Sequence, residues 1–568
     1  MLKILRSSHN DLRIATGLLR KYTKCAYSTG AVKSLKDGPG LKEFITSSNI
    51  HDIETLGAGD DDPVPYLSST DTDGGGRKVY FETYGCQMNV NDTEVAWSIL
   101  ENVGYIKTSD PNSADVILAV TCAVRDNAEQ KVWSRLDYFR SLKRKRSGEL
   151  ALKVGVLGCM AERLKTKLLE TDKMVDLVAG PDSYRDLPRL LSITQSGQSA
   201  VNVLLSLDET YADIMPVRIN SETPSAFVSI MRGCDNMCSF CIVPFTRGRE
   251  RSRDINTIVR EVKALSEQGV KEVTLLGQNV NSYRDLSPSS LPHAYSDSTL
   301  LSRGFSTIYK DKEGGRRFAE LLHQVSLVDP EMRVRFTSPH PKDFPDELLY
   351  LIREQPNICK HIHMPAQSGS TAVLERMRRG YSREKYLDLV QNIRAIIPDV
   401  TLSSDFMTGF CGETEEDHRD TLTLMEAVQY DMAYMFAYSM RKKTHAYHRM
   451  TDDVPEEVKK ARLQELITTF HSIAAVRNQR FIGSEQLVLV EKTSKRSSTD
   501  FAGRIDGNIK VVFPIKDVPC HMASHDSHTR QVKIKPGDYV HVKINSATSL
   551  SLRGIPIACT NLQFYNQT

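Results

Sequence analysis

Two runs of alternating strand and helix patterns constrain the fold of this chain more than any other feature. In the first run, over residues 77–200, strand-like segments such as ADVILAVTC alternate with helical segments such as DTEVAWSILENVG. In the second run, over residues 220–455, six strand–helix units follow one another, beginning with FVSIMRGC. Strands separated by helices form parallel sheets with right-handed crossovers. We therefore predict an α/β protein with an N-terminal parallel α/β domain and a central, at least partial, (βα)6 barrel.

The remaining segments differ in their predicted secondary structure. Residues 456–479 lie in a helical pattern that we expect to leave the barrel and to link it to the C-terminus. Residues 480–568 carry short strands broken by Gly and Pro, which is typical of a small all-β barrel of the oligonucleotide-binding kind. Residues 284–316 interrupt the barrel pattern with Ser, Pro and Gly, so we expect a surface insertion there.

The N-terminal residues have the composition of a targeting sequence. Residues 1–30 hold six Lys or Arg and a single acid, Asp11, with leucines between the arginines. This pattern predicts a mitochondrial transit peptide, and hence a location in the matrix; a short surface helix or a disordered basic tail is the alternative. Residues 31–76, rich in Gly, Ser and Asp, predict a flexible linker.

Composition limits the partners of the protein. The formal net charge is only +3, so affinity for nucleic acid must come from local basic patches. No uninterrupted apolar run approaches the ~20 residues of a membrane helix, so we expect no membrane partner. Eleven cysteines are too few for a disulfide scaffold of this size. Clustered cysteines in a reducing compartment more often bind metal or react.

Three cysteines stand close together just past the first barrel strand, where α/β barrels keep their active sites. Cys234, Cys238 and Cys241, here termed the loop thiols, have the spacing C-x3-C-x2-C. Three thiolates on a 4Fe-4S cube leave one iron open. That iron can chelate the amino and carboxylate groups of S-adenosylmethionine (SAM). Unrelated core cysteines or a zinc site are the alternatives, but no fourth Cys or His follows within twenty residues.

A second set of cysteines lies in the N-terminal domain. Cys86, Cys122 and Cys159, here termed the sheet thiols, each follow a predicted strand, at intervals of 36 and 37 residues. The carboxyl ends of parallel strands lie side by side, and ligands bind there. One such cysteine alone would be interpreted as a buried core residue. Three cysteines at the ends of successive strands predict a second 4Fe-4S cluster, again with one open iron.

Taken together, these features resemble a known enzyme family, the radical SAM methylthiotransferases. The resemblance covers about residues 77–568, and the matching stretches are ETYGCQMN, LGCMAER, RGCDNMCSFCIVPFTRGRERSR, LLGQNVNSY, HMPAQSGS and SSDFMTGFCGETEED. SFCIVPFTRGRE and HMPAQSGS are similar to the branch that modifies N6-isopentenyladenosine in tRNA. GFCGETEEDH and YSMRKKTHAYHRM are similar to its eukaryotic mitochondrial members. Bacterial members usually have proline where Cys411 stands, so we do not expect Cys411 to be a cluster ligand.

The resemblance implies a two-part reaction. An electron from a ferredoxin- or flavodoxin-type donor reduces the cluster on the loop thiols, and SAM is split into methionine and a 5′-deoxyadenosyl radical. The radical removes hydrogen from C2 of the modified adenine, a bond too inert for acid–base chemistry. The cluster on the sheet thiols delivers a sulfur that a second SAM has methylated. The expected product is 2-methylthio-N6-isopentenyladenosine, next to the anticodon of mitochondrial tRNAs.

Polar residues that follow barrel strands are the candidates for binding SAM. Their position at the rim favours a functional role, and a turn or a rim hydrogen bond is the alternative for each. Asp405 ends a strand and is a candidate to bind a ribose or an amino group. The other candidates are Gln278, Asn279, Gln367 and Ser368.

Basic residues beside the loop thiols are candidates to bind RNA. Arg247, Arg249 and Arg253 lie in the stretch TRGRERSR, although Glu250 and Arg253 are also placed to pair with each other. We expect the target adenosine to flip out of the anticodon loop, because stacking hides its C2 edge.

The C-terminal barrel resembles a TRAM module, an RNA-binding β-barrel. Such a barrel would hold the anticodon stem-loop through backbone charge and shape. Arg504 and Lys510 are the candidate RNA contacts within it.

Other functions stay open at this point. Sister branches of the family act on threonylcarbamoyl-adenosine in tRNA or on an aspartate of a ribosomal protein. A kinase-related name within the family suggests a non-catalytic regulator that binds a kinase-activator protein, although all six ligand cysteines are present. We expect a monomer, because one tRNA needs one active site.

Overall fold

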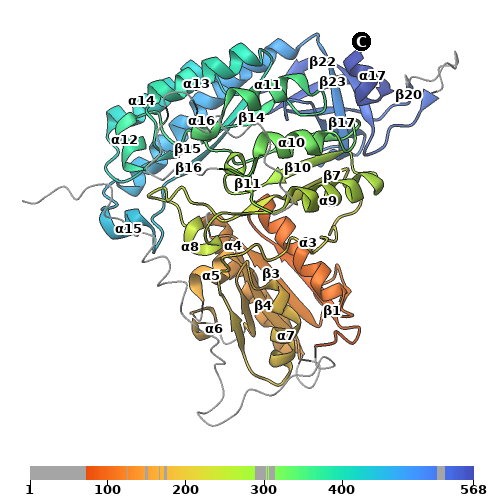
Figure 1. Ribbon diagram of the computed structural model, residues 1–568, viewed down its shortest axis with the longest axis vertical. Helices are drawn as coiled ribbons and strands as arrows, with labels where there is room; N and C mark the ends of the chain where they lie inside the picture. The colour runs from red at the N-terminus through yellow and green to blue at the C-terminus, as the bar shows by residue number, and fades with distance from the viewer. Residues whose placement is uncertain are drawn as a thin grey trace, which may run out of the picture.

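Three bodies follow one another along the chain and pack together (Figure 1). The computed structural model describes residues 72–123, 126–146, 151–165, 167–171, 175–287, 302, 305, 314–520 and 531–567. The expected transit peptide at 1–30, the linker up to residue 71 and most of the 284–316 insertion lie outside the described residues. None of the described helices is both long and apolar enough to span a bilayer.

A parallel sheet with the strand order β2-β1-β3-β4-β5-β6 forms the N-terminal body. Its strands are β1 (Lys78–Thr83), β2 (Ile106–Lys107), β3 (Val116–Thr121), β4 (Lys153–Gly158), β5 (Leu177–Ala179) and β6 (Ala200–Asn202). The central strand β3 is buried along its whole length, as the unbroken apolar sequence VILAVT requires.

Helices cover both faces of this sheet. Helices α3 and α7 pack on one face, and α4 and α5 pack on the other. Together with the short helix α6 their bounds are α3 (Gln87–Glu101), α4 (Asp126–Lys145), α5 (Cys159–Leu164), α6 (Lys167–Thr171) and α7 (Leu187–Gln195). The body is therefore a three-layer α/β domain, as predicted.

Six parallel strands form the central body as an open barrel. They pair in the orders β13-β10-β7 and β14-β15-β16, and a bridge between Val334 and Ile358 joins the two groups. Strands β7 and β16 are the edges of the array. The strands are β7 (Ser225–Ser229), β10 (Glu272–Leu276), β13 (Arg333–Phe336), β14 (His361–His363), β15 (Thr401–Thr408) and β16 (Met432–Ala437).

The outer helices follow the expected 3.6-residue period. Helix α9 (Ile255–Glu267) begins at Asp254, whose carboxylate accepts from two backbone N–H groups, and Gly269 with φ +81° follows its end. Its buried residues recur every three or four positions and face the barrel core. The other outer helices are α10 (Phe318–Ser326), α11 (Asp346–Glu354), α12 (Thr371–Arg376), α13 (Arg383–Ile396) and α14 (Glu415–Val428).

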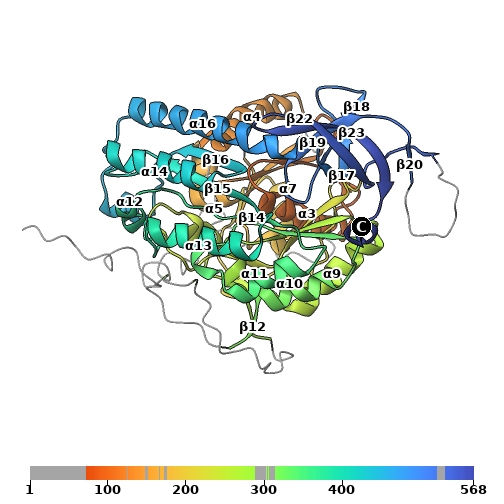
Figure 2. The same ribbon diagram turned by 90° about the horizontal axis from the view of Figure 1, so that it is seen from above.

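We expected helix α16 (Glu456–Asn478) to leave the barrel, but it packs against the barrel instead. Leu466, Phe470 and Ala474, spaced four apart, are buried in the barrel core cluster. The helix lies against β16 and α14 and covers that edge of the sheet (Figure 2). It therefore belongs to the barrel before it leads into the C-terminal body.

The C-terminal body is a closed five-stranded barrel in the order β17-β18-β19-β23-β22. The strands are β17 (Glu485–Thr493), β18 (Asp500–Arg504), β19 (Lys510–Pro514), β22 (Tyr539–Ala547) and β23 (Ser551–Thr560). It docks onto the starts of the central strands: Arg333 donates to two of its backbone carbonyls at 2.8 and 3.0 Å, and Lys360 N donates to Asp506 at 2.8 Å. The small barrel thus sits at the end of the central strands opposite to their carboxyl rim.

Candidate active site

The sheet thiols lie at the ends of three neighbouring strands, because β1 pairs with β3 and β3 pairs with β4. Cys122 directly follows β3, Cys159 is the first residue of α5 after β4, and Cys86 precedes α3. Gly85 has φ +113°, and a Cβ added there would lie 2.4 Å from the Cβ of Cys122. Only glycine permits this approach of the segments that carry Cys86 and Cys122.

The surroundings of the sheet thiols favour thiolate formation unequally. A hydrogen bond from Cys122, followed by the charge of Arg247, lowers the pKa of Cys86 to about 6. Burial raises the pKa of Cys159, and the charge of Arg247 opposes that effect. Cys86 is exposed, whereas Cys122 and Cys159 are buried. Since the thiolate is the form that binds metal, the set is suited to a ligand role.

The loop thiols lie between two short strands, β8 (Met231–Arg232) and β9 (Arg251–Ser252), which pair antiparallel. Gly233 has φ +74°, and a Cβ added there would lie 2.0 Å from the carbonyl oxygen of Arg249. Arg249 in turn donates to Asp235 at 2.6 Å. A glycine and an ion pair therefore hold the entrance of the loop against its exit.

Nearby donors point at the loop thiols. The backbone N–H of Asn236 donates to Cys234 Sγ at 3.5 Å, and the buried Arg379 donates to Cys238 Sγ at 3.5 Å. Burial raises the pKa of Cys234 well above its usual range and that of Cys241 to about 12. Binding of a metal to these thiols would therefore release their protons.

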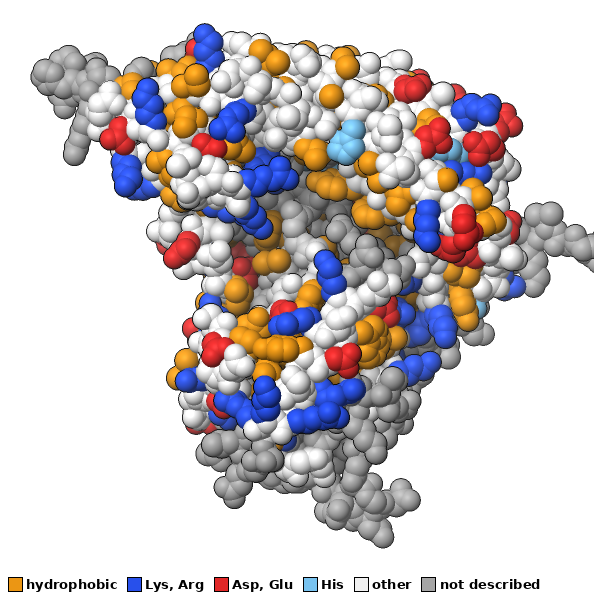
Figure 3. All heavy atoms as spheres, turned by 180° about the vertical axis from the view of Figure 1, so that it is seen from behind, with side chains coloured by type: hydrophobic (Ala, Val, Ile, Leu, Met, Phe, Trp, Pro, Cys, Tyr) orange, Lys and Arg blue, Asp and Glu red, His pale blue; other side chains and the backbone are white. Residues whose placement is uncertain are grey.

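Helix α8 (Val243–Arg247) connects the two sets of thiols: it begins two residues after Cys241 and reaches Cys159. Ile242 packs in a small buried cluster with Cys159, and α8 contacts α5 (Figure 1). Arg247 Nε lies 3.2 Å from Cys159 Sγ. Seen from behind, the molecule is hollowed between the barrel and the N-terminal body, and Lys and Arg side chains line the margins (Figure 3).

The donor set fits iron–sulfur clusters better than single ions. Within the described ranges, no three Cys, His, Asp or Glu side chains form a group that could hold one metal ion. Each thiol set offers three sulfur ligands from separate backbone segments or a wide loop, and hydrogen-bond donors point at a sulfur of each set. Such donors are a usual feature of iron–sulfur ligation.

The rim residues after β10 serve two purposes. Gln278 Oε1 is buried and has no hydrogen-bond partner among the described residues, so it is available to a bound molecule. Asn279 is 1% exposed and already engaged: it donates to Asp343 at 3.1 Å and accepts from His340 N at 3.0 Å. Its side chain holds the rim loops together, which is the alternative that the sequence left open.

The rim residues after β14 and β15 divide in the same way. Ser368 is buried and shares a hydrogen bond with Thr421 at 3.2 Å, so its role is to fix the loop. Gln367 has φ +69°, and its N–H donates to the carbonyl oxygen of Asp405. The Asp405 carboxylate is 31% exposed and lies 3.5 Å from His363 Nε2. The Asp405 carboxylate is therefore accessible to a bound molecule.

The interior face of β14–β16 also carries residues that the sequence did not single out. Ser403 Oγ lies 2.9 Å from nitrogens of both His361 and His363. The His363 ring meets the ring of Tyr434 edge-on with the ring centroids 5.9 Å apart, and Tyr434 is 48% exposed on the edge strand β16. The register of the strands places these residues on the same face as Asp405, because Asp405 pairs with Tyr434 and His363 pairs with Ser403.

Two of the arginines expected to bind RNA are buried instead. Arg247 is 3% exposed and paired with Asp92, and Arg253 is 6% exposed and donates to Glu261 at 2.7 Å. Glu250, the other partner considered for Arg253, accepts from a serine hydroxyl. Neither guanidinium is available to a phosphate in this structure, because a buried cation needs a buried partner.

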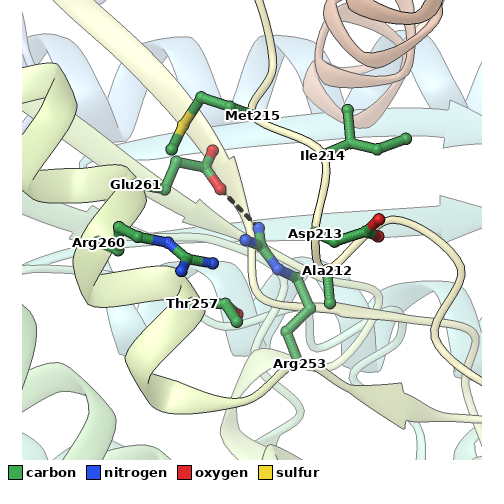
Figure 4. Close-up of a pocket in the computed structure, with 8 residues that line it drawn as sticks. All are labelled: Ala212, Asp213, Ile214, Met215, Arg253, Thr257, Arg260 and Glu261. Carbon is green, nitrogen blue, oxygen red and sulfur yellow. Dashed lines mark hydrogen bonds and ion pairs between the residues drawn. The ribbon is translucent and has the colours of Figure 1, made fainter.

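Arg253 belongs to the wall of a separate cavity of about 320 Å³ between α9 and the segment that leads from the N-terminal body. Figure 4 shows its ion pair with Glu261 inside this cavity. The lining residues are Ala212, Asp213, Ile214, Met215, Arg253, Thr257, Arg260 and Glu261. No thiol lines it, so it is distinct from the site described above.

The other RNA candidates lie nearer the surface. Arg249 is 39% exposed while it pairs with Asp235. Arg504 is 38% exposed and pairs with Glu491 at 2.9 Å, and Lys510 is exposed on β19. Arg504 and Lys510 belong to the small barrel, which docks at the far end of the central strands from the loop thiols.

Known proteins match the chain along most of its length. Residues 78–180 match the uncharacterized protein family UPF0004, 228–425 the radical SAM superfamily and 479–557 the TRAM domain. The mouse mitochondrial tRNA methylthiotransferase CDK5RAP1 is 60% identical over 530 residues, covering 93% of this chain and 89% of that protein. A tRNA-2-methylthio-N(6)-dimethylallyladenosine synthase of Amoebophilus asiaticus is 50% identical over 84% of this chain and 92% of that protein. The chain belongs to the radical SAM tRNA methylthiotransferases.

This methylthiotransferase is therefore an enzyme, and the predicted fold class is confirmed in all three bodies. A Caenorhabditis elegans CDK5RAP1-like protein is a further relative, 49% identical over 94% of this chain and 95% of that protein. An iron–sulfur cluster and SAM are the cofactors of the superfamily to which the barrel belongs.

Proposed function

We propose that this methylthiotransferase converts N6-isopentenyladenosine, next to the anticodon of mitochondrial tRNAs, into 2-methylthio-N6-isopentenyladenosine. The observation that carries the proposal is that Ile242, the residue after the last loop thiol, packs with the sheet thiol Cys159. One reaction center can thereby use both a radical source and a sulfur source. The name of the mouse relative favours mitochondrial tRNA, and the name of the Amoebophilus relative favours this modified adenosine.

We assign one 4Fe-4S cluster to each thiol set. When bound, the two clusters and SAM would supply the radical that removes the C2 hydrogen and the methylated sulfur that replaces it. Gln278 would accept a hydrogen bond from SAM through its unpaired Oε1, and Asp405 would accept from a ribose or an amino group. Arg379 donates to Cys238 and keeps the loop oriented.

RNA binding would combine the hollow between the bodies with the small barrel. Arg249, Arg504 and Lys510 would contact phosphates, and the target base would flip toward the interior face of β14–β16. The exposed ring of Tyr434 offers a stacking surface there. The small barrel sits at the opposite end of the central strands, so it would hold the stem while the loop reaches the rim.

The cellular setting completes the proposal. The enzyme would act in the mitochondrial matrix, since the mammalian relatives are named mitochondrial enzymes. It would act as a monomer, because one tRNA needs one active site. A ferredoxin- or flavodoxin-type protein would provide the electron. Threonylcarbamoyl-adenosine as the substrate, or a non-catalytic role on a kinase activator, are the competing outcomes of the test below.

The test pairs cluster analysis with product analysis. Anaerobically reconstituted enzyme should hold about 8 iron per chain, and about 4 after Cys→Ala replacement of either thiol set. With SAM, a reductant and a synthetic anticodon stem-loop, mass analysis should show methylthiolation of isopentenyladenosine and none of threonylcarbamoyl-adenosine. Modification of only the second substrate would assign the enzyme to the sister branch, and iron-free protein without product would favour the regulatory role.

A further inference from the structure

A buried chain of charges connects the N-terminal sheet with the barrel beside the thiols. Asp92 on α3 is fully buried and accepts from Arg232 of β8 at 2.9 Å and from Arg247 of α8. Arg232 also lies 3.9 Å from Glu209. Asp92 and both arginines are at most 3% exposed, so solvent screens their ion pairs little.

Arg247 faces three different groups from this position. Its Nη2 donates to Asp92 and, at 3.2 Å, to Asn89, while its Nε donates to Cys159 Sγ at 3.2 Å. Its Nη1 is buried and has no hydrogen-bond partner among the described residues. Because a guanidinium is planar, the two bonds to α3 fix the direction in which the other donors point.

A purely structural role accounts for only part of this arrangement. An ion pair with Asp92 would explain Nη2, but it leaves Nε on a cysteine sulfur and both N–H groups of Nη1 without an acceptor among the described residues. An unpaired buried donor is unfavourable and calls for an absent acceptor. The sheet thiols once ionised, with the sulfides of a cluster, would be the anions closest to this side of the guanidinium.

We infer that Arg247 is a positioning residue for the cluster on the sheet thiols, with Nε donating to the Cys159 thiolate and Nη1 to a sulfur of the cluster or of the group to be transferred. This inference rests on the second cluster of the proposed function. Hydrogen bonds to sulfur and a nearby positive charge both raise the reduction potential of an iron–sulfur cluster. Asp92 acts through Arg247 by fixing its orientation.

The same residue also joins the two thiol sets. Arg247 ends the short helix that follows Cys241, so a displacement of the loop thiols moves the donor that serves Cys159. Arg379 occupies the equivalent place beside the loop thiols, with its donor 3.5 Å from Cys238.

The experiment isolates the second cluster. The parent protein is the full chain with Cys234, Cys238 and Cys241 replaced by Ala, which should retain about 4 iron. Arg247→Gln and Arg247→Lys are made in this parent, with Arg185→Gln as a control in an exposed ion pair of the same body. For each protein the midpoint potential of the cluster is measured by an EPR-monitored redox titration, and iron release to a chelator is timed.

We expect Arg247→Gln to move the potential to more negative values and to speed iron release about tenfold, as for other residues that orient metal ligands. Arg247→Lys, which keeps the charge, should recover part of the potential. If Arg247→Gln does not fold, Arg247→Lys tests the inference, because its midpoint potential must still differ from that of the parent. Potentials and release rates equal to those of the parent would overturn the inference. A parent without iron would refute the second cluster itself, and this inference with it.

Discussion

Arg247 Nε and Cys159 Sγ lie 3.2 Å apart although 88 residues separate them and they belong to different bodies of the molecule. The contact depends on Asp92, which accepts from Arg247 and from Arg232 while fully buried. The carboxylate lets two cations leave water at the interface between the N-terminal sheet and the barrel. This buried charge cluster therefore helps to fix the position of the sheet thiols relative to the loop thiols, together with the buried ion pair of Arg251 and Asp182.

Replacing Asp92 should destabilise the whole molecule. Asp92→Ala leaves Arg232 and Arg247 buried without a carboxylate, and breaking such a pair costs about 3–5 kcal/mol. The melting temperature of the full chain should fall by several degrees. As a control, Asp213→Asn removes an exposed partner of Arg185 and should cost about 1 kcal/mol or less. Equal melting temperatures for the two variants would contradict the importance of the buried cluster.

Adding one methyl group at Gly233 should remove the cluster on the loop thiols. A Cβ there would lie 2.0 Å from the carbonyl oxygen of Arg249, so the loop must move and Cys234 with it. Reconstituted Gly233→Ala should therefore hold about 4 iron in place of about 8.

A second glycine separates the clash from backbone strain. Gly269 has a similar φ of +81° but nothing within 4 Å of an added Cβ. Gly269→Ala should cost only the roughly 1–2 kcal/mol of a left-handed alanine and keep all of its iron. Full iron content in Gly233→Ala would show that the loop tolerates the displacement.

The positions of the sheet thiols follow from local sequence, because each one stands at or near the end of a strand that its own residues define. The loop thiols follow from their close spacing in the single loop between β8 and β9. The uninterrupted apolar run of β3 and the Asp254 cap of α9 are likewise local signals. Helix α16 was predictable too, since Leu466, Phe470 and Ala474 recur at i, i+4 and i+8, a spacing that marks a buried face.

The partners of the arginines were not predictable in this way. Arg247 meets Asp92 across 155 residues, and no local pattern distinguishes a buried arginine from one that binds phosphate. The stretch TRGRERSR looks like a basic patch, yet Arg247 and Arg253 point inward and only Arg249 is substantially exposed. Tertiary pairing decides their role, and a single sequence does not contain it.

Cys411 should not affect cluster content. It is 3% exposed and packs in an apolar cluster with Phe410 and Tyr438, where a small thiol behaves as a hydrophobic side chain. Cys411→Ala should keep about 8 iron and lower the melting temperature only slightly. Cys122→Ala, a matched change of a buried cysteine, should lose iron. Iron loss from Cys411→Ala would identify Cys411 as a ligand.

Glu162 should make stability depend on pH. Burial raises the pKa of this carboxyl from 4.5 to about 8, and one of its oxygens has no hydrogen-bond partner among the described residues. Between these pH values the folded chain keeps a proton that the unfolded chain has released. Stability therefore falls as pH rises through that window, by at most about 1.4 kcal/mol per pH unit.

Substitution of Glu162 tests this dependence. The glutamine of Glu162→Gln does not titrate. The melting temperature of this variant should therefore fall less between pH 5 and 8, about three pH units within the window, than that of the unsubstituted enzyme. The control is Glu354→Gln, which changes an exposed ion pair with Arg353. Its melting temperature should depend on pH in the same way as that of the unsubstituted enzyme. Parallel curves for all three proteins would mean that Glu162 is ionised in the folded state.

Lys510 should contribute to RNA affinity through charge alone. It is exposed at the start of β19 in the small barrel, so it can meet a phosphate without losing a buried partner. Lys510→Gln should weaken binding of the anticodon stem-loop and reduce the slope of log affinity against log salt by about 1. Lys385→Gln, on α13 and 45% exposed, carries the same charge change on another surface and should leave the slope unchanged. An unchanged slope for Lys510→Gln would place the RNA on a different face of the small barrel.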